Sequence, residues 1–303
     1  HRAAAARRRA PRGRARAVKP DRRADLELAL AAARAAGRVV LAAFGTEQPV
    51  TEKGPDQPLT PADLEADRLL KRLLLEERDG YGWLSEETAD NPDRLGCSRV
   101  WIVDPIDGTR SFIAGRPEFA ISIGLAEDGA AVLGVVHNPA TGELCWAIRG
   151  AGAYRVLDDG AMERLAVRGW MPGETPVLAA SRSEIARGEL DPFRSRSHLL
   201  PVGSTAYKLV KIAAGEADGF LSRGPKSEWD VCAGDLLVRE AGGRATDLAG
   251  RPLLYNRPNP FVAGILASSG PVHDVLGEVL RTLPPVPRLL EERARHAVPE
   301  EDD

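Results

Sequence analysis

The most informative stretch of this sequence is Trp101-Ile102-Val103-Asp104-Pro105-Ile106-Asp107-Gly108-Thr109. It is typical of an apolar strand that runs directly into two carboxylates separated by a rigid proline. Acids three residues apart at a tight turn can point at one spot together with the Ile106 carbonyl, and such oxygen donors suit Mg²⁺. Gly108 lets backbone amides approach an anion closely, and the Thr109 hydroxyl can orient a water. The alternative is a polar turn whose Asp side chains bond their own backbone.

Three more segments place an acid at the end of a predicted element. Glu86-Glu87 follows the strand-like run Trp83-Leu84-Ser85, and Asp230 precedes an apolar helix. Asp63 is the acid of a capping box that begins with Thr60. Each acid has an ordinary alternative role, as a solvated side chain or a helix cap. Carboxylates gathered at one point repel each other unless a cation neutralises them, so four such segments favour a shared cation site.

Hydrophobic periodicity divides the body of the chain into two lobes with a shared interface. The first lobe, residues 21–170, combines helices with an antiparallel sheet, and the second, residues 171–285, alternates strands and helices as an α/β lobe does. Lobe interfaces are common places for ligand sites. The predicted helices are 21–44, 60–78, 204–214, 231–241 and 272–283, and the predicted strands are 82–85, 99–103, 119–126, 131–137, 143–149, 176–180, 199–202, 217–221 and 261–267.

The composition is that of a globular chain large enough for two joined lobes, with 303 residues, 43% hydrophobic and 28% charged. The three cysteines, Cys97, Cys145 and Cys232, show no spacing typical of a disulfide framework or a zinc site. A reducing cytoplasm is therefore the expected location. No apolar run is long enough to span a membrane, and no export signal follows the basic start.

The basic residues are unevenly distributed along the chain. Residues 1–20 hold eight of the 41 Lys and Arg and no acid, which leaves 33 basic against 44 acidic residues after them. This arm is predicted to be disordered because it has few large apolar residues, and the acidic segment 286–303 is predicted to be a solvated tail. The arm either binds nucleic acid or another acidic surface, or it is a non-native start; the missing initial Met favours the second interpretation.

Three segments, in this order, resemble the inositol monophosphatase superfamily of Mg²⁺-dependent, lithium-sensitive phosphatases: Trp83-Leu84-Ser85-Glu86-Glu87, Asp104-Pro105-Ile106-Asp107-Gly108-Thr109 and Trp229-Asp230-Val231-Cys232-Ala233-Gly234. The resemblance covers roughly residues 22–285. It implies an α/β (α+β) fold, a layered α-β-α-β-α sandwich, and a site for two or three Mg²⁺ ions. The implied metal ligands are Glu86, Asp104, the Ile106 carbonyl, Asp107 and Asp230. The implied catalytic residues are Asp63 and Thr109, which would orient the attacking water, and Glu86, while the amides of Gly108 and Thr109 would hold the phosphate.

These residue types can hydrolyse a phosphate ester without a covalent nucleophile. Carboxylate-held Mg²⁺ can lower the pKa of a water and neutralise charge on the leaving oxygen. Ser111 has no histidine nearby in the sequence, and the five histidines show no metal-site or triad spacing.

Within the superfamily the chain most resembles the 3′(2′),5′-bisphosphate nucleotidases, which convert adenosine 3′,5′-bisphosphate to AMP. Seven residues before Asp230, where inositol monophosphatases have a Glu for ring hydroxyls, this chain has Arg223, and a guanidinium suits a second phosphate. Lys226 can add to the same pocket. Thr205 to Tyr207 make the spacing before Lys208 slightly longer than in the nucleotidases. The segments that carry the resemblance are Gly115-Arg116-Pro117-Glu118-Phe119, Gly203-Ser204 with Lys208, Gly224-Pro225 and Gly250-Arg251-Pro252-Leu253; the predicted substrate-binding residues are Gly108, Thr109, Gly203, Ser204, Lys208 and Arg223.

Other functions stay open at this point. The alternative enzyme is an inositol 1-phosphate or sugar phosphate (fructose 1,6-bisphosphate) phosphatase, which a panel of substrates would separate. A non-enzymatic chain would use the acids as a structural cation site or the basic arm to bind nucleic acid. The expected partner is a small phosphorylated metabolite; a membrane is excluded, nucleic acid is disfavoured, and a homodimer is possible.

Overall fold

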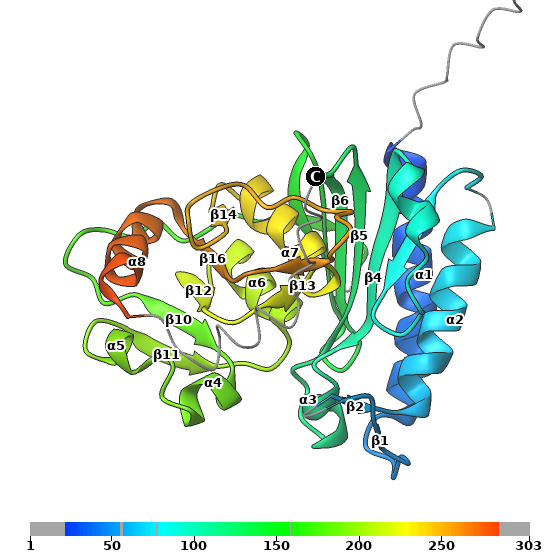
Figure 1. Ribbon diagram of the computed structural model, residues 1–303, viewed down its shortest axis with the longest axis horizontal. Helices are drawn as coiled ribbons and strands as arrows, with labels where there is room; N and C mark the ends of the chain where they lie inside the picture. The colour runs from blue at the N-terminus through cyan, green and yellow to red at the C-terminus, as the bar shows by residue number, and fades with distance from the viewer. Residues whose placement is uncertain (1–21, 55–56, 77, 158, 285–303) are drawn as a thin grey trace, which may run out of the picture.

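The computed structural model describes residues 22–54, 57–76, 78–157 and 159–284. The predicted arm, 1–20, and the predicted tail, 286–303, lie outside the described residues. Helices and sheets stack in five layers, α-β-α-β-α, along the long axis of the molecule (Figure 1). The outer layers are α1 (Arg22–Ala43) with α2 (Pro61–Leu75), and α4 (Arg182–Ala186) with α5 (Asp191–Arg194) and α8 (Gly270–Thr282); the central layer is α6 (Thr205–Ala213) with α7 (Glu228–Glu240). Two short connectors are α3 (Thr109–Ile113) and the 3₁₀ helix η1 (Pro92–Gly96).

The larger sheet has seven strands in the order β3-β4-β5-β6-β7-β8-β9. The predicted meander is confirmed, but the prediction of a purely antiparallel sheet is wrong, because β3 and β4 are parallel. The last two strands escape prediction because β8 is only five residues long and β9 is a three-residue exposed strand at the sheet edge. The strands are β3 (Gly82–Ser85), β4 (Arg99–Asp107), β5 (Ala120–Glu127), β6 (Ala130–Asn138), β7 (Glu143–Ile148), β8 (Gly152–Val156) and β9 (Met162–Arg164).

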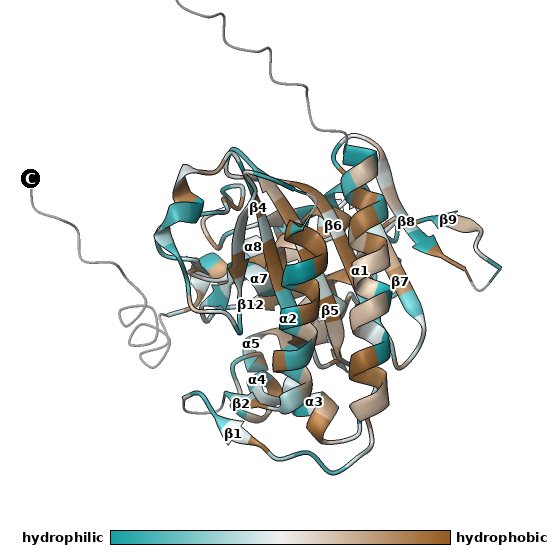
Figure 2. Cartoon of the chain, turned by 90° about the vertical axis from the view of Figure 1, so that its right-hand side faces the viewer, coloured by the Kyte–Doolittle hydropathy of each residue, from teal (hydrophilic) through white to brown (hydrophobic). Residues whose placement is uncertain are grey.

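The two faces of this sheet carry side chains of different size. Toward α1 and α2, strand β5 presents Ile121, Ile123 and Leu125, which share a core with the alanines of α1. Figure 2 shows these two helices side by side over the sheet. Toward α7, the same strand presents Ser122 and Gly124. On one face of the sheet, large side chains of β5 thus pack against the alanines of α1. On the other face, small residues of β5 allow α7 to pack closely against the sheet.

The smaller sheet is mixed, with strand order β11-β10-β12-β16-β14. The single strand predicted over 261–267 is wrong, because the chain turns at Gly264, whose φ is 145°. Its first part pairs with the segment just before α7 instead of joining the sheet. The strands are β10 (Val177–Ala180), β11 (His198–Pro201), β12 (Gly219–Ser222), β14 (Arg244–Thr246) and β16 (Ile265–Ser268), with the separate pairs β13 (Lys226–Ser227) and β15 (Phe261–Val262), and β1 (Thr51–Glu52) and β2 (Pro58–Leu59).

Candidate active site

Strand register brings two of the predicted acids side by side. Ser85, the last residue of β3, pairs with Val103 of β4, and the Glu86 amide donates to the Val103 carbonyl at 3.2 Å. Glu86 therefore lies beside Asp104, the next residue of β4. The parallel pairing allows this, because parallel strands leave the sheet at the same edge.

Asp230 reaches the same place through β5. Asp104 pairs with Ser122, whose hydroxyl donates to the Trp229 carbonyl at 3.0 Å. At the start of α7, the Ser227 amide donates to Asp230 Oδ2 at 3.1 Å. The N-cap role considered for Asp230 is wrong, because Ser227 is the N-cap residue; Asp230 is instead the acid of a capping box three residues later, and this bond fixes the direction of its carboxylate.

The carboxylates of Glu86, Asp104 and Asp230 each offer an oxygen within 4.8 Å of the others. Burial, together with repulsion from Glu86, raises the pKa of Asp104 well above its usual range. Burial and the nearby Asp107 raise the pKa of Asp230 to about 8. Asp104 is buried and Glu86 and Asp230 are half-buried, so their mutual repulsion is unfavourable without a cation, and this all-oxygen set fits Mg²⁺.

Asp107 is held by residues nearly 100 positions further along the chain, at the start of α6. Its Oδ2 accepts the Ser204 hydroxyl at 2.6 Å and the Ala206 amide at 2.5 Å. Ser204 has φ 56°, a left-handed conformation that strains a residue with a side chain. The segment before α6 also lies so close to Ser111 that position 203 must be a glycine, since a Cβ there would lie 2.2 Å from Ser111 Oγ. The predicted substrate residues Gly203 and Ser204 both line the cleft, and Ser204 holds Asp107 as well.

Thr109, Asp63 and the Ile106 carbonyl meet at the turn after β4. Thr109 Oγ1 lies 3.2 Å from Asp63 Oδ1 and 3.0 Å from the Ile106 carbonyl oxygen. The other Asp63 oxygen accepts the amide and hydroxyl of Thr60 at 2.8 and 2.6 Å, which directs Oδ1 toward Thr109. Burial raises the pKa of Asp63, so this carboxylate is a stronger base than an exposed one. Gly108, with φ 96°, makes the turn that brings them together.

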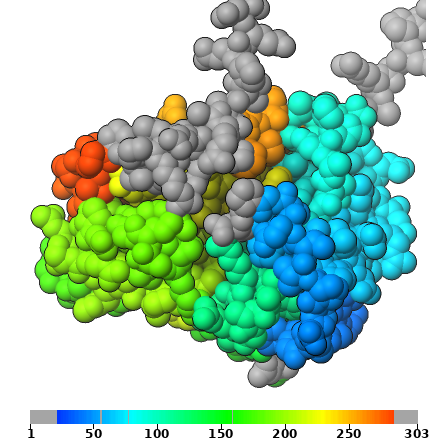
Figure 3. Space-filling view, turned by 60° about the horizontal axis from the view of Figure 1, so that its bottom comes forward, coloured from blue at the N-terminus to red at the C-terminus, as the bar shows by residue number. Residues whose placement is uncertain are grey.

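Of the residues described above, Glu86, Asp104, Ile106, Asp107, Gly108, Thr109, Gly203, Ser204 and Asp230 line a cleft of about 1000 Å³. Asp63 is not among the lining residues and is linked to the cleft through Thr109. Figure 3 shows early segments of the chain, blue to cyan, and later segments, green to yellow, side by side on one face of the molecule. Six Lys and Arg also line the cleft: Arg110, Arg116, Arg182, Arg187, Lys208 and Lys226. We call this set the cationic wall.

Lys208 is the most deeply buried residue of the cationic wall. It is 2% exposed, its ammonium donates to Ser181 Oγ at 2.8 Å, and it lies 4.9 Å from the centre of the Phe220 ring. Burial lowers the pKa of Lys208 to about 8, against the opposing effect of Glu184. Lys226 lies 3.7 Å from the same Glu184 carboxylate. Ser181 thus holds Lys208 and Glu184 pairs with Lys226, and both lysines line the cleft.

Arg223, which the sequence predicts to bind substrate, is not among the cleft-lining residues. Its guanidinium donates to the carbonyl of Pro284, 61 residues further along the chain. Sequence reasoning missed Arg182 and Arg187, and also Lys53, whose ammonium lies 2.8 Å from Glu86 Oε1 and 2.6 Å from Glu87 Oε1. No local sequence motif marks these three cations. Only the fold brings Arg182 and Arg187 to the cleft and Lys53 to Glu86 and Glu87.

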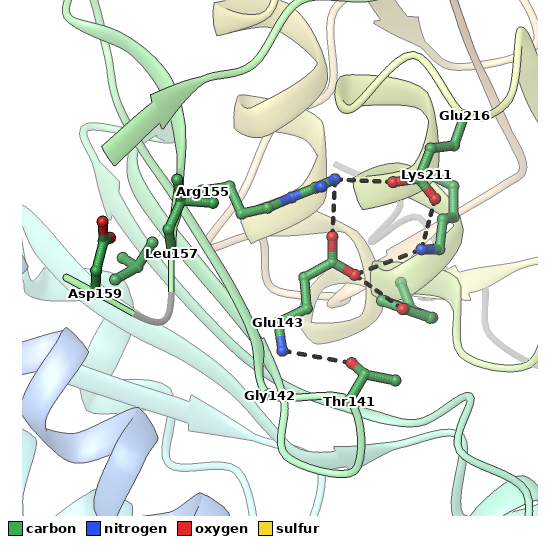
Figure 4. Close-up of a pocket in the computed structure, with 10 residues that line it drawn as sticks. Thr141, Gly142, Glu143, Arg155, Leu157, Asp159, Lys211 and Glu216 are labelled. Atoms are coloured by element: carbon green, nitrogen blue, oxygen red, sulfur yellow. Dashed lines mark hydrogen bonds and ion pairs between the residues drawn. The ribbon is translucent and has the colours of Figure 1, made fainter. Parts of the chain in front are cut away.

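A second hollow, of about 690 Å³, lies beside α6 (Figure 4). Its charges satisfy one another: Glu143 lies 2.9 Å from Arg155 and 3.4 Å from Lys211, and Glu216 lies 2.8 Å from each of these cations. Tyr207 donates to Glu143 at 2.8 Å. This network braces α6, whose first turn holds Asp107, and lacks the excess of cations seen in the first cleft.

A layered sandwich with clustered acid oxygens and a cationic wall in one cleft defines a class of proteins, the metal-dependent phosphate hydrolases. The model of the inositol monophosphatase family matches residues 21–281. The chain belongs to this family, whose members are metal-dependent phosphatases, so the resemblance and the fold predicted from the sequence are confirmed.

Several relatives with different names share this match. An inositol-1-monophosphatase of Mesorhizobium japonicum is 38% identical, covering 76% of this chain and 87% of the relative. A histidinol-phosphatase of Mycobacterium tuberculosis is 35% identical (86% and 97% covered), and the 3′(2′),5′-bisphosphate nucleotidase CysQ of Aggregatibacter actinomycetemcomitans is 32% identical (70% and 80%). The crystal structure of the extragenic suppressor protein SuhB of Bartonella henselae superposes with a TM-score of 0.74 at 31% identity, covering 86% of this chain and 99% of that one.

None of the helices in the described part of the chain has the length and apolar character that crossing a membrane requires.

Proposed function

We propose that this chain is a Mg²⁺-dependent phosphomonoesterase that removes the 3′-phosphate of adenosine 3′,5′-bisphosphate to give AMP. Glu86, Asp104, Asp107, Asp230 and the Ile106 carbonyl would hold the metal. Bound there, Mg²⁺ would supply an activated water and neutralise charge on the leaving oxygen.

The residues around the metal site have separate tasks in this proposal. The Thr109 hydroxyl orients the attacking water, and Asp63, whose Oδ1 accepts that hydroxyl at 3.2 Å, takes up the water's proton by way of Thr109. The amides of Gly108 and Thr109 hold the phosphate. Thr60 keeps Asp63 in place through its amide and hydroxyl.

The single observation that carries the choice of substrate is the cationic wall. Three acids, Glu118, Glu184 and Glu189, neutralise part of its charge through Arg182, Lys226 and Arg187, respectively. Within the cationic wall, six cations against these three acids leave an excess of positive charge. The four other carboxylates of the cleft, Glu86, Asp104, Asp107 and Asp230, are those that a bound metal would neutralise. Such a surface favours a substrate with a second phosphate and disfavours histidinol phosphate, whose leaving group carries an ammonium.

A second candidate is inositol 1-phosphate, and the observation that favours it is the 38% identity to an inositol-1-monophosphatase. Its leaving group is neutral and would gain little from the cationic wall. The two substrates therefore respond differently to the removal of charge from this wall.

Variants of the wall test the proposal. We expect Arg182→Gln and Lys226→Gln each to lower kcat/KM for adenosine 3′,5′-bisphosphate by about tenfold, close to the 1.5–3 kcal/mol range of charge-assisted hydrogen bonds. Turnover of inositol 1-phosphate should change less than about twofold. Arg196→Gln is the matched control, because Arg196 is exposed and does not line the cleft. Equal losses on both substrates would contradict the assignment of a second-phosphate subsite.

A further inference from the structure

Asp67 is a buried acid to which the proposed chemistry gives no role. It lies on α2 one turn after Asp63 and is 5% exposed. Its Oδ1 accepts the Ser85 hydroxyl at 2.5 Å, and its Oδ2 accepts the Thr88 hydroxyl at 2.6 Å. Both carboxylate oxygens of Asp67 are thus engaged by one short segment of chain.

The two hydroxyls stand on either side of the acid pair Glu86-Glu87. Trp83 Nε1 donates to Thr88 Oγ1 at 3.3 Å, so the Thr88 hydroxyl proton is directed to Asp67. A carboxylate can accept both hydroxyls, whereas an amide offers one acceptor and one donor. Asp67 is therefore suited to fix both flanks of this turn at once.

The acids of this turn face repulsion from the other carboxylates of the site, which the single ammonium of Lys53, 2.8 Å from Glu86 and 2.6 Å from Glu87, offsets only in part. Glu86 lies within the carboxylate cluster that also contains Asp104 and Asp230. It extends beyond the end of β3, so the strand ladder holds only its amide. Bonds from α2 to Ser85 and Thr88 oppose an outward movement of the turn.

We propose that Asp67 is a positioning residue that keeps Glu86 at the metal site by bonding Ser85 and Thr88. Its effect on metal affinity stands on geometry alone, while its effect on turnover rests on the proposed phosphatase function. Asp67 contacts neither substrate nor metal in this role. Its loss should therefore weaken metal binding more than it slows the fully loaded enzyme.

Asp67→Asn tests this, with Glu65→Gln as the matched control, because Glu65 is an exposed acid on the same helix. Calorimetric titration with Mg²⁺ alone should show at least fivefold weaker binding for Asp67→Asn and no change for the control. Activity measured against Mg²⁺ concentration should show the same shift in half-saturation, with kcat restored when Mg²⁺ saturates. Urea unfolding without Mg²⁺ separates this effect from a loss of stability.

Unchanged Mg²⁺ binding by a folded Asp67→Asn would overturn the proposal, even if the variant were less stable. Should that variant not fold, Thr88→Val takes its place, with a two- to threefold shift expected and no shift contradicting the idea. In the double variant, Thr88→Val should add little to Asp67→Asn, because the two residues act through one bond. If the wild type bound Mg²⁺ but hydrolysed no phosphate ester, the proposed function would fail while the role of Asp67 could still be judged by calorimetry.

Discussion

Asp104 has the least favourable surroundings of the acids in the site. It is 1% exposed, and burial together with the charge of Glu86 raises its pKa. An acid whose pKa is higher in the folded than in the unfolded chain destabilises the fold at pH values above its unfolded pKa. The negative charge of Asp104 therefore lowers the stability of the fold, and a bound cation would reduce this loss.

We expect Asp104→Asn to abolish phosphate release while the fold stays intact. An amide fills the same space and can still accept the Ile106 amide, now 3.0 Å from Asp104 Oδ1, but it lacks the charge that holds a metal. In Mg²⁺-free buffer at pH 7 the variant should be at least as stable as the wild type in urea. Full activity, or a clear loss of stability without Mg²⁺, would contradict the assignment.

Ser204 combines backbone strain with a contact to a predicted metal ligand. Ser204→Gly and Ser204→Ala both remove the hydroxyl that Asp107 accepts, but only glycine adopts φ 56° without strain. The glycine variant should therefore be more stable than the alanine variant by about 1–2 kcal/mol, measured from urea midpoints. Both should need more Mg²⁺ than the wild type. An alanine variant as stable as the glycine variant would show that the strain is not real.

At the residue scale, the sequence located acids better than cations. Glu86, Asp104 and Asp230 lie at strand or helix ends within recognisable motifs, and the structure brings them together. Their roles as metal ligands remain predictions. Of the cations, Arg182 lines the cleft without having been predicted, and Arg223 was predicted but does not line it. The position of such a long side chain depends on partners that are distant in sequence, such as the Pro284 carbonyl for Arg223.

At the scale of elements, the seating of α7 on the larger sheet controls where Asp230 lies. A Cβ at Gly134 would lie 2.6 Å from the Ala233 carbonyl oxygen, and one at Gly124 would lie 2.6 Å from Cys232 Sγ. The sheet and the helix backbone are thus as close as glycine allows. Any added volume at Gly134 would have to move the helix that carries Asp230.

We expect Gly134→Ala to destabilise the fold by about 1–3 kcal/mol, because its methyl group would meet backbone atoms of α7, which cannot rotate away. The shift of Asp230 should also raise the Mg²⁺ concentration needed for half-maximal activity. Gly169→Ala is the control, since nothing lies within 4 Å of its Cβ position. If Gly134→Ala unfolded at the wild-type urea concentration, the contact between α7 and the sheet would be looser than the structure indicates.

The predicted and observed elements differ where tertiary contacts outweigh local pattern. The apolar run 261–267 resembles one strand, yet Gly264 divides it between two sheets. Strand β9 consists of exposed residues with no apolar alternation, so it forms only because β8 offers a free edge. The long helices and the meander were predictable because their periodicity agrees with their packing.

At the scale of the whole molecule, the site forms only where segments far apart in the sequence pack together. Residues before 170 supply Glu86, Asp104 and Asp107, and residues after 170 supply Asp230 and four of the six cations of the cationic wall. One hydrophobic core joins them, with Ile102 of β4 and Phe220 of β12 in the same cluster. Periodicity predicted two lobes with a shared interface, whereas the order of the five layers followed only from the resemblance of three motifs.

The most direct measurement is phosphate release from adenosine 3′,5′-bisphosphate, inositol 1-phosphate and fructose 1,6-bisphosphate side by side, with Mg²⁺, without it, and with added Li⁺. We predict release that requires Mg²⁺, falls with Li⁺, and favours the nucleotide by more than about tenfold in kcat/KM, or about 1.4 kcal/mol. A preference for inositol 1-phosphate would contradict the role of the cationic wall. Release that is independent of metal would contradict the proposed chemistry itself.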